Sequence, residues 1–212
     1  MAIPVLILGK SGSGKSASMR NFKKDELGVI NVMGKPLPFK NVLAIESTTD
    51  YGKVAAVLNA AKVPSIVIDD AGYLITHEFM TRHSTTGGGN AVYALYNEMA
   101  DKFYNLIRTI SNIPWEKIVY LIMHEDKNDF GDIKPKTIGK LLDEKVCVEG
   151  LFTIVLRSTI SGQGKHVFVT QSSGLDVAKS PMGMFADTEI DNDLKAVDVK
   201  IREYYAMEAN GK

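Results

Sequence analysis

Eight residues near the start of the chain constrain its fold more than any other feature. A four-residue spacer separates two glycines, and a lysine and a serine follow, in the order Gly9, Lys10, Ser11, Gly12, Ser13, Gly14, Lys15 and Ser16. The apolar run from Ile3 to Leu8 predicts a strand before them, and residues 16–24 predict a helix after them. Glycines let backbone N–H groups turn inward around a phosphate, and a helix N-terminus adds partial positive charge. The eight residues are therefore predicted to form a phosphate-binding loop.

Lys15 and Ser16 carry the chemistry expected of this loop. Lys15 would reach the β- and γ-phosphates of a nucleoside triphosphate, and the Ser16 hydroxyl would bind Mg²⁺. The pattern thus indicates ATP and Mg²⁺ as cofactors, and the sequence leaves open whether GTP is preferred. The alternative is a plain Gly-Ser turn before a helix, with no ligand.

Strands and helices alternate along the first two-thirds of the chain, which predicts an α/β fold with a mostly parallel sheet flanked by helices. The expected strands cover residues 29–32, 42–45, 65–68 and 118–123, and the expected helices cover 51–62, 73–81 and 91–113. Two β-rich runs, 152–159 and 166–171, flank a turn and predict an antiparallel hairpin at one edge of the sheet. We expect one domain over 1–212, with loops at 84–90, 125–137 and 172–184, a short helix at 138–146 and an amphipathic helix at 191–209.

Composition excludes several classes of protein. The single cysteine, Cys147, rules out an intramolecular disulfide, and no apolar run approaches the roughly 20 residues of a membrane span. We therefore expect a cytoplasmic protein without a membrane partner. Lysine plus arginine (25) balance aspartate plus glutamate (25), so no global basic field attracts nucleic acid. Residues 1–40 are mainly basic and residues 187–208 mainly acidic, which indicates either solvated faces or head-to-tail contacts between copies.

A second strand ends in acidic residues, as a magnesium site requires. The apolar run from Ser65 to Ile68 leads into Asp69 and Asp70. Asp69 is predicted to hold the magnesium through water, and Asp70 is a candidate base for the attacking water. Because neighbours along a strand point to opposite faces, the two carboxylates are expected to have separate roles. Glu46 is a competing base, and a helix N-cap is the alternative interpretation of one of the two aspartates.

His124 follows the apolar run 118–123. If this strand neighbours the strand that ends at Asp69, His124 faces the γ-phosphate at the carboxyl edge of the sheet. A polar side chain there can report hydrolysis to the loop that follows. The alternative is a surface histidine capped by Glu125.

The loop at 9–16, the acidic strand end at 69–70, His124 and the hairpin resemble the P-loop NTPases, and more narrowly the RecA-like ATPases, over residues 3 to about 171. The stretches Gly34 to Phe39 and Leu175 to Ser180 look like small phage-encoded RecA-like ATPases of the recombination and single-strand annealing type. The resemblance implies a slow, DNA-stimulated ATPase in the cytoplasm of a bacterial host. It also implies assembly on single-stranded DNA as a homo-oligomer, either a ring or a filament.

The resemblance further implies where DNA would bind. In RecA-like proteins two mobile loops contact DNA, and they correspond here to 82–90 and 125–136. The candidate DNA contacts are Arg82, His83, Phe130, Lys134, Lys136 and Lys140. Phe130 would stack on a base, and the lysines would contact the backbone. Four acidic residues reduce the positive charge of the second stretch, so two solvated loops are the alternative.

RecA-like ATPases complete their sites with a cation from a neighbouring subunit, and here Lys179 is the first candidate and Arg157 the second. One departure concerns the strand 29–32, which in the family precedes the catalytic glutamate but is followed here by Met33 and Gly34. The base is therefore open, and slow hydrolysis is expected. A nucleotide-gated loader or interaction ATPase is an alternative function. A small-molecule kinase is disfavoured, because the five arginines are too scattered to form a lid over the phosphates.

Overall fold

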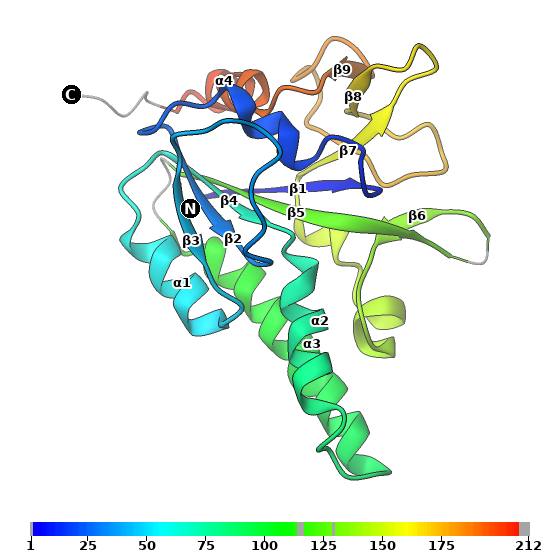
Figure 1. Cartoon of the computed structure of the whole chain (residues 1–212). Helices are drawn as coiled ribbons and strands as arrows, with labels where there is room; N and C mark the ends of the chain where they lie inside the picture. Colours follow the sequence, from blue (N-terminus) through cyan, green and yellow to red (C-terminus); the bar gives the residue numbers. More distant parts are fainter. Residues whose placement is uncertain (1, 114–116, 129, 208–212) are drawn as a thin grey trace.

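Strand β1 (Ile3–Gly9) lies inside a mixed sheet of nine strands in the computed structural model, which describes residues 2–113, 117–128 and 130–207 (Figure 1). The order across the sheet is β3-β2-β4-β5-β1-β7-β8-β9, and β6 pairs with β5 outside this path. Six strands run parallel, namely β1, β2 (Leu27–Asn31), β3 (Ala44–Ser47), β4 (Ser65–Asp69), β5 (Ile118–Lys127) and β7 (Ile154–Ile160). The remaining strands are antiparallel to their neighbours, namely β6 (Ile133–Pro135), β8 (His166–Val169) and β9 (Glu189–Asp191).

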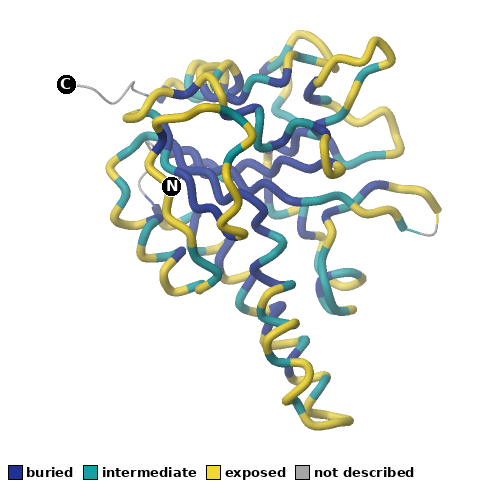
Figure 2. The backbone as a smooth tube through the Cα atoms, in the orientation of Figure 1, coloured by how far each residue is buried: buried dark blue, intermediate teal, exposed yellow. Residues whose placement is uncertain are grey.

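This arrangement confirms the expected α/β class, the mostly parallel sheet and the antiparallel hairpin. The hairpin is formed by β7 and β8, and β9 adds one strand beyond it at the edge. The strands β1, β4 and β5 are buried through nearly their whole apolar length, as their continuous hydrophobic runs predict (Figure 2).

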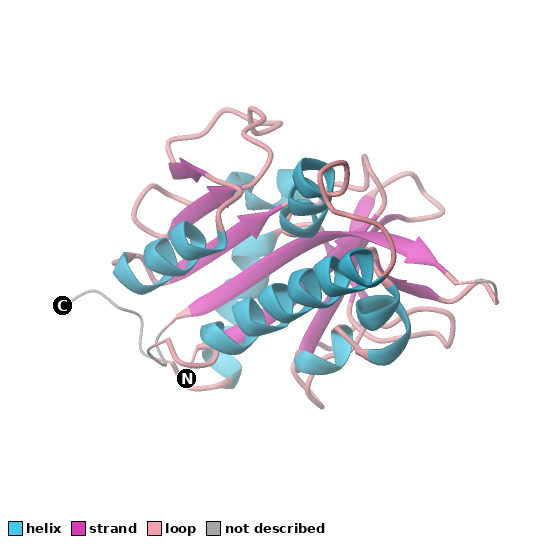
Figure 3. Cartoon of the chain, turned by 90° about the horizontal axis from the view of Figure 1, so that it is seen from below, coloured by secondary structure: helices cyan, strands magenta, loops and turns pink. Residues whose placement is uncertain are grey.

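Helices cover both faces of the sheet. On one face lie α1 (Tyr51–Ala60), α2 (Gly72–Arg82) and α3 (Asn90–Ile110), which pack over Leu6 and Leu8 of β1 (Figure 3). On the other face α4 (Leu194–Tyr204) and a short 3₁₀ helix, η1 (Ser16–Asn21), pack over Val5 and Ile7. Alternate residues of β1 therefore pack into two separate hydrophobic cores, one on each face of the sheet. This packing holds β1 between the two layers of helices.

Strand β5 lies between β1 and β4, and this neighbourhood positions the site. In the parallel register of β1 and β5, His124 is opposite Gly9, the first residue of the phosphate-binding loop. On its other side β5 pairs with β4, with Leu121 opposite Ile68 just before Asp69. The carboxyl ends of three strands thus bring the three predicted motifs to one edge of the sheet.

Several elements differ from the expectations. The helix after the loop is only the six-residue 3₁₀ helix Ser16–Asn21, and residues 138–146 hold a five-residue π-type turn, η2 (Leu141–Lys145). The segment 125–137 is not simply a loop, because β5 continues to Lys127 and pairs with β6. The terminal helix is shorter than 191–209, since Asp193 caps its start and α4 ends at Tyr204. Residues 208 and 209 lie outside the described residues.

The basic start and the acidic end of the chain meet within one molecule. Lys195 of α4 lies 3.0 Å from Glu26, and Arg20 donates to the backbone oxygen of Asn192 at 2.6 Å. Asn21 donates to Asp193 at 2.7 Å. These contacts join η1 and the segment after it to the start of α4, but none of them pairs a basic side chain of residues 1–40 with an acidic side chain of residues 187–208.

Candidate nucleotide site

The phosphate-binding loop leaves β1 at Gly9 and turns back on itself before η1. Gly12 and Gly14 have φ values of +77° and +99°, a conformation that favours glycine. A Cβ on Gly14 would also lie 3.0 Å from the imidazole of His166 and 3.1 Å from the side chain of Asn192. Both the backbone conformation and the close neighbours therefore require glycine at position 14.

Lys15 is buried at the centre of the loop, with 6% of its surface exposed. Its ammonium group donates to the backbone oxygens of Gly9 (2.8 Å) and Lys10 (2.7 Å). Burial lowers the pKa of Lys15, and the nearby carboxylates of Asp70 and Asp69 act in the opposite direction. The loop thus holds one desolvated positive charge where a phosphate would enter.

Ser16 and Asp69 are in direct contact, as a shared magnesium site requires. The Ser16 hydroxyl donates to Oδ1 of Asp69 at 2.8 Å, and Asp69 is 5% exposed. Burial raises the pKa of Asp69 to about 6, despite the hydrogen bond from Ser16. A hydroxyl and a carboxylate are oxygen ligands of the kind that Mg²⁺ prefers.

These two residues fit a magnesium ion that is held mainly by its nucleotide. Among the described residues, no group of three or more His, Cys, Asp or Glu side chains could hold a metal. Mg²⁺ usually keeps several waters and binds through one or two protein ligands together with phosphate oxygens. Ser16 and Asp69 would supply those protein ligands.

Asp70 follows β4 in a left-handed conformation, with φ of +60°, which is uncommon for a residue other than glycine. Its Oδ2 lies 2.8 Å from Nζ of Lys35, and its Oδ1 lies 3.6 Å from Nε2 of His124. Burial acts to raise the pKa of Asp70, but the contacts with His124 and Lys35 outweigh it and lower the pKa to about 2. The carboxylate is thus held in its charged form.

The expectation that Asp69 and Asp70 point to opposite faces is wrong. It assumed that the strand continues through both residues, whereas β4 ends at Asp69 and the backbone turns at Asp70. Both carboxylates consequently line one cavity, although they contact different partners.

This cavity, which we call the nucleotide cavity, has a volume of about 410 Å³ at the carboxyl edge of the sheet. Its lining includes Ser11, Gly12, Gly14, Lys15, Ser16, Asp69, Asp70 and His124. The other predicted loop residues contribute through their backbone, since Gly9 and Lys10 accept from Lys15 and the Ser13 oxygen accepts from Ser158 at 2.8 Å. The structure thus brings the loop, both acidic residues and His124 together.

Three polar lining residues, Asn31, Lys35 and His166, were not among the predicted site residues. Asn31, at the end of β2, donates from its side chain to the backbone oxygen of Lys35 at 2.6 Å, and Lys35 contacts Asp70. His166 begins β8 and lies 2.9 Å from the Ser13 oxygen. A usable signal existed for Asn31, because polar residues at the end of a parallel strand gather at the carboxyl edge of the sheet. No local pattern points to His166, which arrives from a hairpin far along the chain.

Three other candidates do not reach the nucleotide cavity. Glu46 is exposed on the edge strand β3, and strands β2 and β4 lie between it and β5. Arg157 is held by Glu125, with nitrogen–oxygen distances of 2.8 and 3.1 Å. Lys179 pairs through its backbone with Val155 of β7, at 2.8 and 2.9 Å. Within one chain, neither of the two candidate cations lines the cavity.

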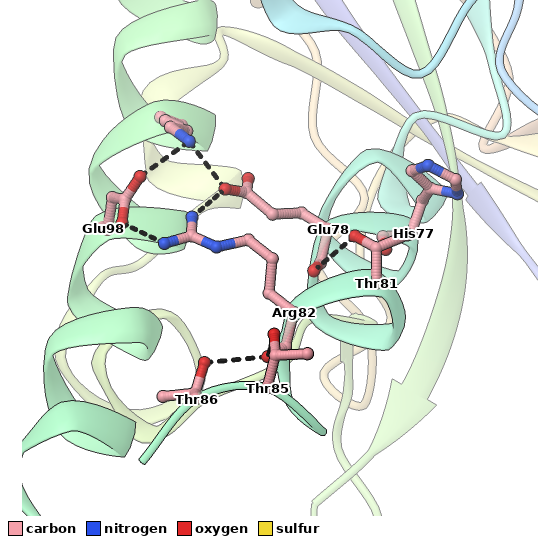
Figure 4. A network of polar contacts seen from close by, with 8 residues as sticks. His77, Glu78, Thr81, Arg82, Thr85, Thr86 and Glu98 are labelled. Carbon is pink, nitrogen blue, oxygen red and sulfur yellow. Dashed lines mark hydrogen bonds and ion pairs between the residues drawn. The ribbon is translucent and has the colours of Figure 1, made fainter.

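Arg82, a candidate DNA contact, is engaged by carboxylates between α2 and α3. Its guanidinium lies 2.7 Å from Glu78 and 2.7 Å from Glu98, and Lys102 joins the same two acids at 2.6 and 2.8 Å (Figure 4). His83 stacks on Phe79, with ring centroids 4.9 Å apart. Both candidates therefore stabilise the end of the helix pair.

The other DNA candidates lie on or beside the β5–β6 hairpin, on a different projection of the molecule (Figure 1). Phe130 is 90% exposed. Lys136 and Lys140 are exposed, and Lys134 lies 3.8 Å from Asp143. The structure thus separates the six candidates into two sets.

Comparison with known families shows the class of protein. A family model described as an AAA domain matches residues 1–182. The chain belongs to this family. The match begins before the phosphate-binding loop and includes both acidic residues, His124 and the β7–β8 hairpin, while β9 and α4 lie beyond it. AAA domains are P-loop ATPases, so the ATPase class and the use of a nucleotide follow from membership.

Two further findings concern this AAA domain protein. No curated protein matches the chain. Among the described residues, no helix is long and apolar enough to cross a membrane.

Proposed function

We propose that this AAA domain protein is a magnesium-dependent ATPase that assembles on single-stranded DNA and promotes recombination or annealing. The observation that carries the ATPase part is the convergence of Lys15, the Ser16–Asp69 pair and Asp70 in one cavity. Phosphoryl transfer needs little covalent chemistry from the protein, and it depends on positioning and on charge stabilisation. These residues supply both.

Each side chain has a proposed role in hydrolysis. The oxygen of a water molecule bonds to the γ-phosphorus as the bond to the β–γ bridging oxygen breaks, which leaves ADP and phosphate. Asp70 accepts the proton of that water, and Lys15 stabilises the negative charge on the phosphates. Because Asp70 has a pKa of about 2 in its contacts with His124 and Lys35, it is a weak base. Slow turnover is the expected consequence.

His124 supports a link between the nucleotide and DNA. It lies opposite Gly9 in the sheet and beside Asp70, and its backbone oxygen accepts from the amide of Lys136 at 2.8 Å. The β5–β6 hairpin, which carries Phe130, starts directly after it. A change at the γ-phosphate can therefore pass through one strand to the exposed hairpin.

The proposal retains Lys179 as a cation that a neighbouring copy supplies. Lys35 supplies a further cation within the same chain, where it contacts Asp70 at 2.8 Å.

A kinase is disfavoured by the positions of the arginines. All five lie among the described residues, and none lines the nucleotide cavity. A nucleotide-gated loader or interaction ATPase remains the second candidate, because a weak base and an exposed hairpin would serve it equally well.

The deciding experiment measures ATP turnover with and without single-stranded DNA, with Lys15→Ala as the inactive control. Turnover that DNA stimulates supports the first function. ATP binding with no DNA effect supports the loader, and phosphorylation of an added small molecule would overturn both.

A further inference from the structure

A second cavity adjoins the nucleotide cavity on the side of Lys35 and His124. It has a volume of about 540 Å³ and shares Ser11, Lys35 and His124 with the nucleotide cavity. Beyond these it is lined by the start of α2 and by residues that follow β6, including Tyr73 and Lys136. It therefore borders the first part of the phosphate-binding loop, at Lys10 and Ser11, and extends away from it towards α2 and β6.

Lys35 and His124 line both cavities and lie at the boundary between them. Lys35 and His124 both approach Asp70, at 2.8 and 3.6 Å. Tyr73 lies on the side of the second cavity, with Lys35 Nζ 5.7 Å from its ring centroid and the His124 ring at 5.8 Å. The Lys35 side chain is 61% exposed, so it can leave Asp70 without disturbing the core.

The second cavity is positively charged. Lys10, Lys35 and Lys136 line it, and its one lining carboxylate is Glu125. Glu125 is neutralised by two contacts with Arg157, and only 2% of its side chain is exposed. Within the described part of the chain, Lys10 and Lys136 form no ion pair, so two ammonium groups are available to an anion.

We propose that the second cavity is a binding site for inorganic phosphate, through which the product of ATP hydrolysis leaves the protein. The proposal rests on the ATPase activity proposed above. While ADP occupies the phosphate-binding loop, the cleaved phosphate passes between Lys35 and His124 and is bound by Lys136 and Lys10. No bond is made or broken in this step, because the ligand is the phosphate dianion already formed.

The test varies the charge at position 136. The variants Lys136→Arg, Lys136→Ala and Lys136→Glu are compared with Lys127→Ala, which removes an exposed lysine of the same hairpin that lines neither cavity. Since Lys136 holds the fold through its backbone amide, these changes preserve that hydrogen bond. Two quantities are measured. The first is the inhibition of turnover by added phosphate, and the second is the rate at which the protein releases phosphate, followed with a fluorescent phosphate sensor.

We expect Lys136→Ala to weaken phosphate inhibition about fivefold, which corresponds to ~1 kcal/mol of lost binding free energy. We also expect this variant to release phosphate more slowly. Lys136→Glu should have a larger effect, and Lys136→Arg should restore wild-type behaviour. Equal inhibition and release in Lys136→Ala and Lys127→Ala would overturn the proposal.

Two further measurements distinguish this proposal from a DNA-binding role of the cavity and from a failure of the proposed ATPase function. If Lys136→Ala loses affinity for an oligothymidylate but keeps normal phosphate inhibition, the cavity serves a DNA phosphate and the exit site is refuted. If the wild type does not turn over ATP, the proposed function fails. Binding of radioactive phosphate to the ADP-bound protein, by equilibrium dialysis, then still decides whether the site exists.

Discussion

Lys15 is the buried positive charge of the phosphate-binding loop, and its ammonium group is held by two backbone oxygens of that loop. We predict that Lys15→Ala lowers ATP turnover by a factor on the order of 10²–10³ or more, because it removes the cation that faces the β- and γ-phosphates. A steady-state assay of ADP formation measures this, with the exposed Lys24→Ala as control. Unimpaired turnover in Lys15→Ala would contradict the assignment of the loop.

The two aspartates have different partners, and their variants should therefore differ. Asp69→Asn removes the carboxylate that contacts Ser16, so we expect loss of turnover and a higher magnesium requirement, with nucleotide binding partly retained by the loop backbone. Asp70→Asn removes the proposed base and should lower turnover without changing the magnesium requirement. Turnover measured across a magnesium titration distinguishes them. If Asp70→Asn is the variant with the altered magnesium dependence, the roles are reversed.

The residues of the site differ in how far the sequence could predict them. The phosphate-binding loop, Asp69 and His124 lie within or directly after apolar strand runs, so their position at one edge follows from local patterns. Lys35 reaches Asp70 through a loop whose path no local pattern sets. The left-handed backbone conformation of Asp70 could not be predicted from the sequence either, because the tertiary surroundings impose it on a residue other than glycine.

At the scale of elements, the pair α2–α3 is held at its outer end by exposed charges (Figure 4). Hydrogen bonds from Arg82 and Lys102 lower the pKa of Glu98 from its ordinary 4.5 to about 2. A carboxylate with a lowered pKa stabilises the fold above its ordinary pKa, and this contribution is lost as the pH falls from 4.5 towards 2.

We therefore predict that Glu98→Gln is less stable than the wild type at neutral pH, and that the difference shrinks as the pH falls below about 4.5. The effect is small, since solvent screens these exposed pairs. Urea unfolding of both proteins between neutral pH and about pH 3 measures it. A difference that stays constant across this range would show that the Glu98 charge is not responsible.

The elements that the sequence could not predict depend on pairing between short segments. The central strands are long apolar runs and are found at their expected places. Strand β6 has only three residues, too few for a periodic pattern to stand out, and Glu125 to Lys127 of β5 are all charged. Only their mutual pairing makes them strands, and that is a tertiary effect.

At the scale of the whole molecule, α4 is joined to the sheet by a buried polar cluster. Asp198 accepts from Tyr120 of β5 at 2.9 Å and from Arg202 at 2.8 Å, and it also contacts Ser65 of β4. Asp198 is 2% exposed. This cluster ties the end of the chain, beyond the matched family region, to two central strands.

We predict that Asp198→Ala lowers the free energy of unfolding by about 3–5 kcal/mol, because it removes the buried carboxylate that Tyr120, Arg202 and Ser65 all contact. Urea unfolding that is followed by both circular dichroism and tyrosine fluorescence measures the loss. A single coincident transition would agree with one domain over residues 1–212. A separate early transition with an unchanged main one would mean that α4 is dispensable.

Assembly gives the last prediction. Lys179 contributes to the fold through its backbone pairing with Val155, so Lys179→Ala preserves those hydrogen bonds and removes only the side chain. If a neighbouring copy uses Lys179 to stabilise the transferring phosphate, Lys179→Ala should bind ATP but lose most turnover at saturating single-stranded DNA. Mixing it with Lys15→Ala should then restore part of the activity, because some interfaces combine an intact loop from one copy with an intact Lys179 from the other. Turnover across mixing ratios measures this, with Lys165→Ala in the exposed hairpin turn as control. Normal turnover in Lys179→Ala would contradict the shared site and leave Lys35 as the cation that a single chain supplies for itself.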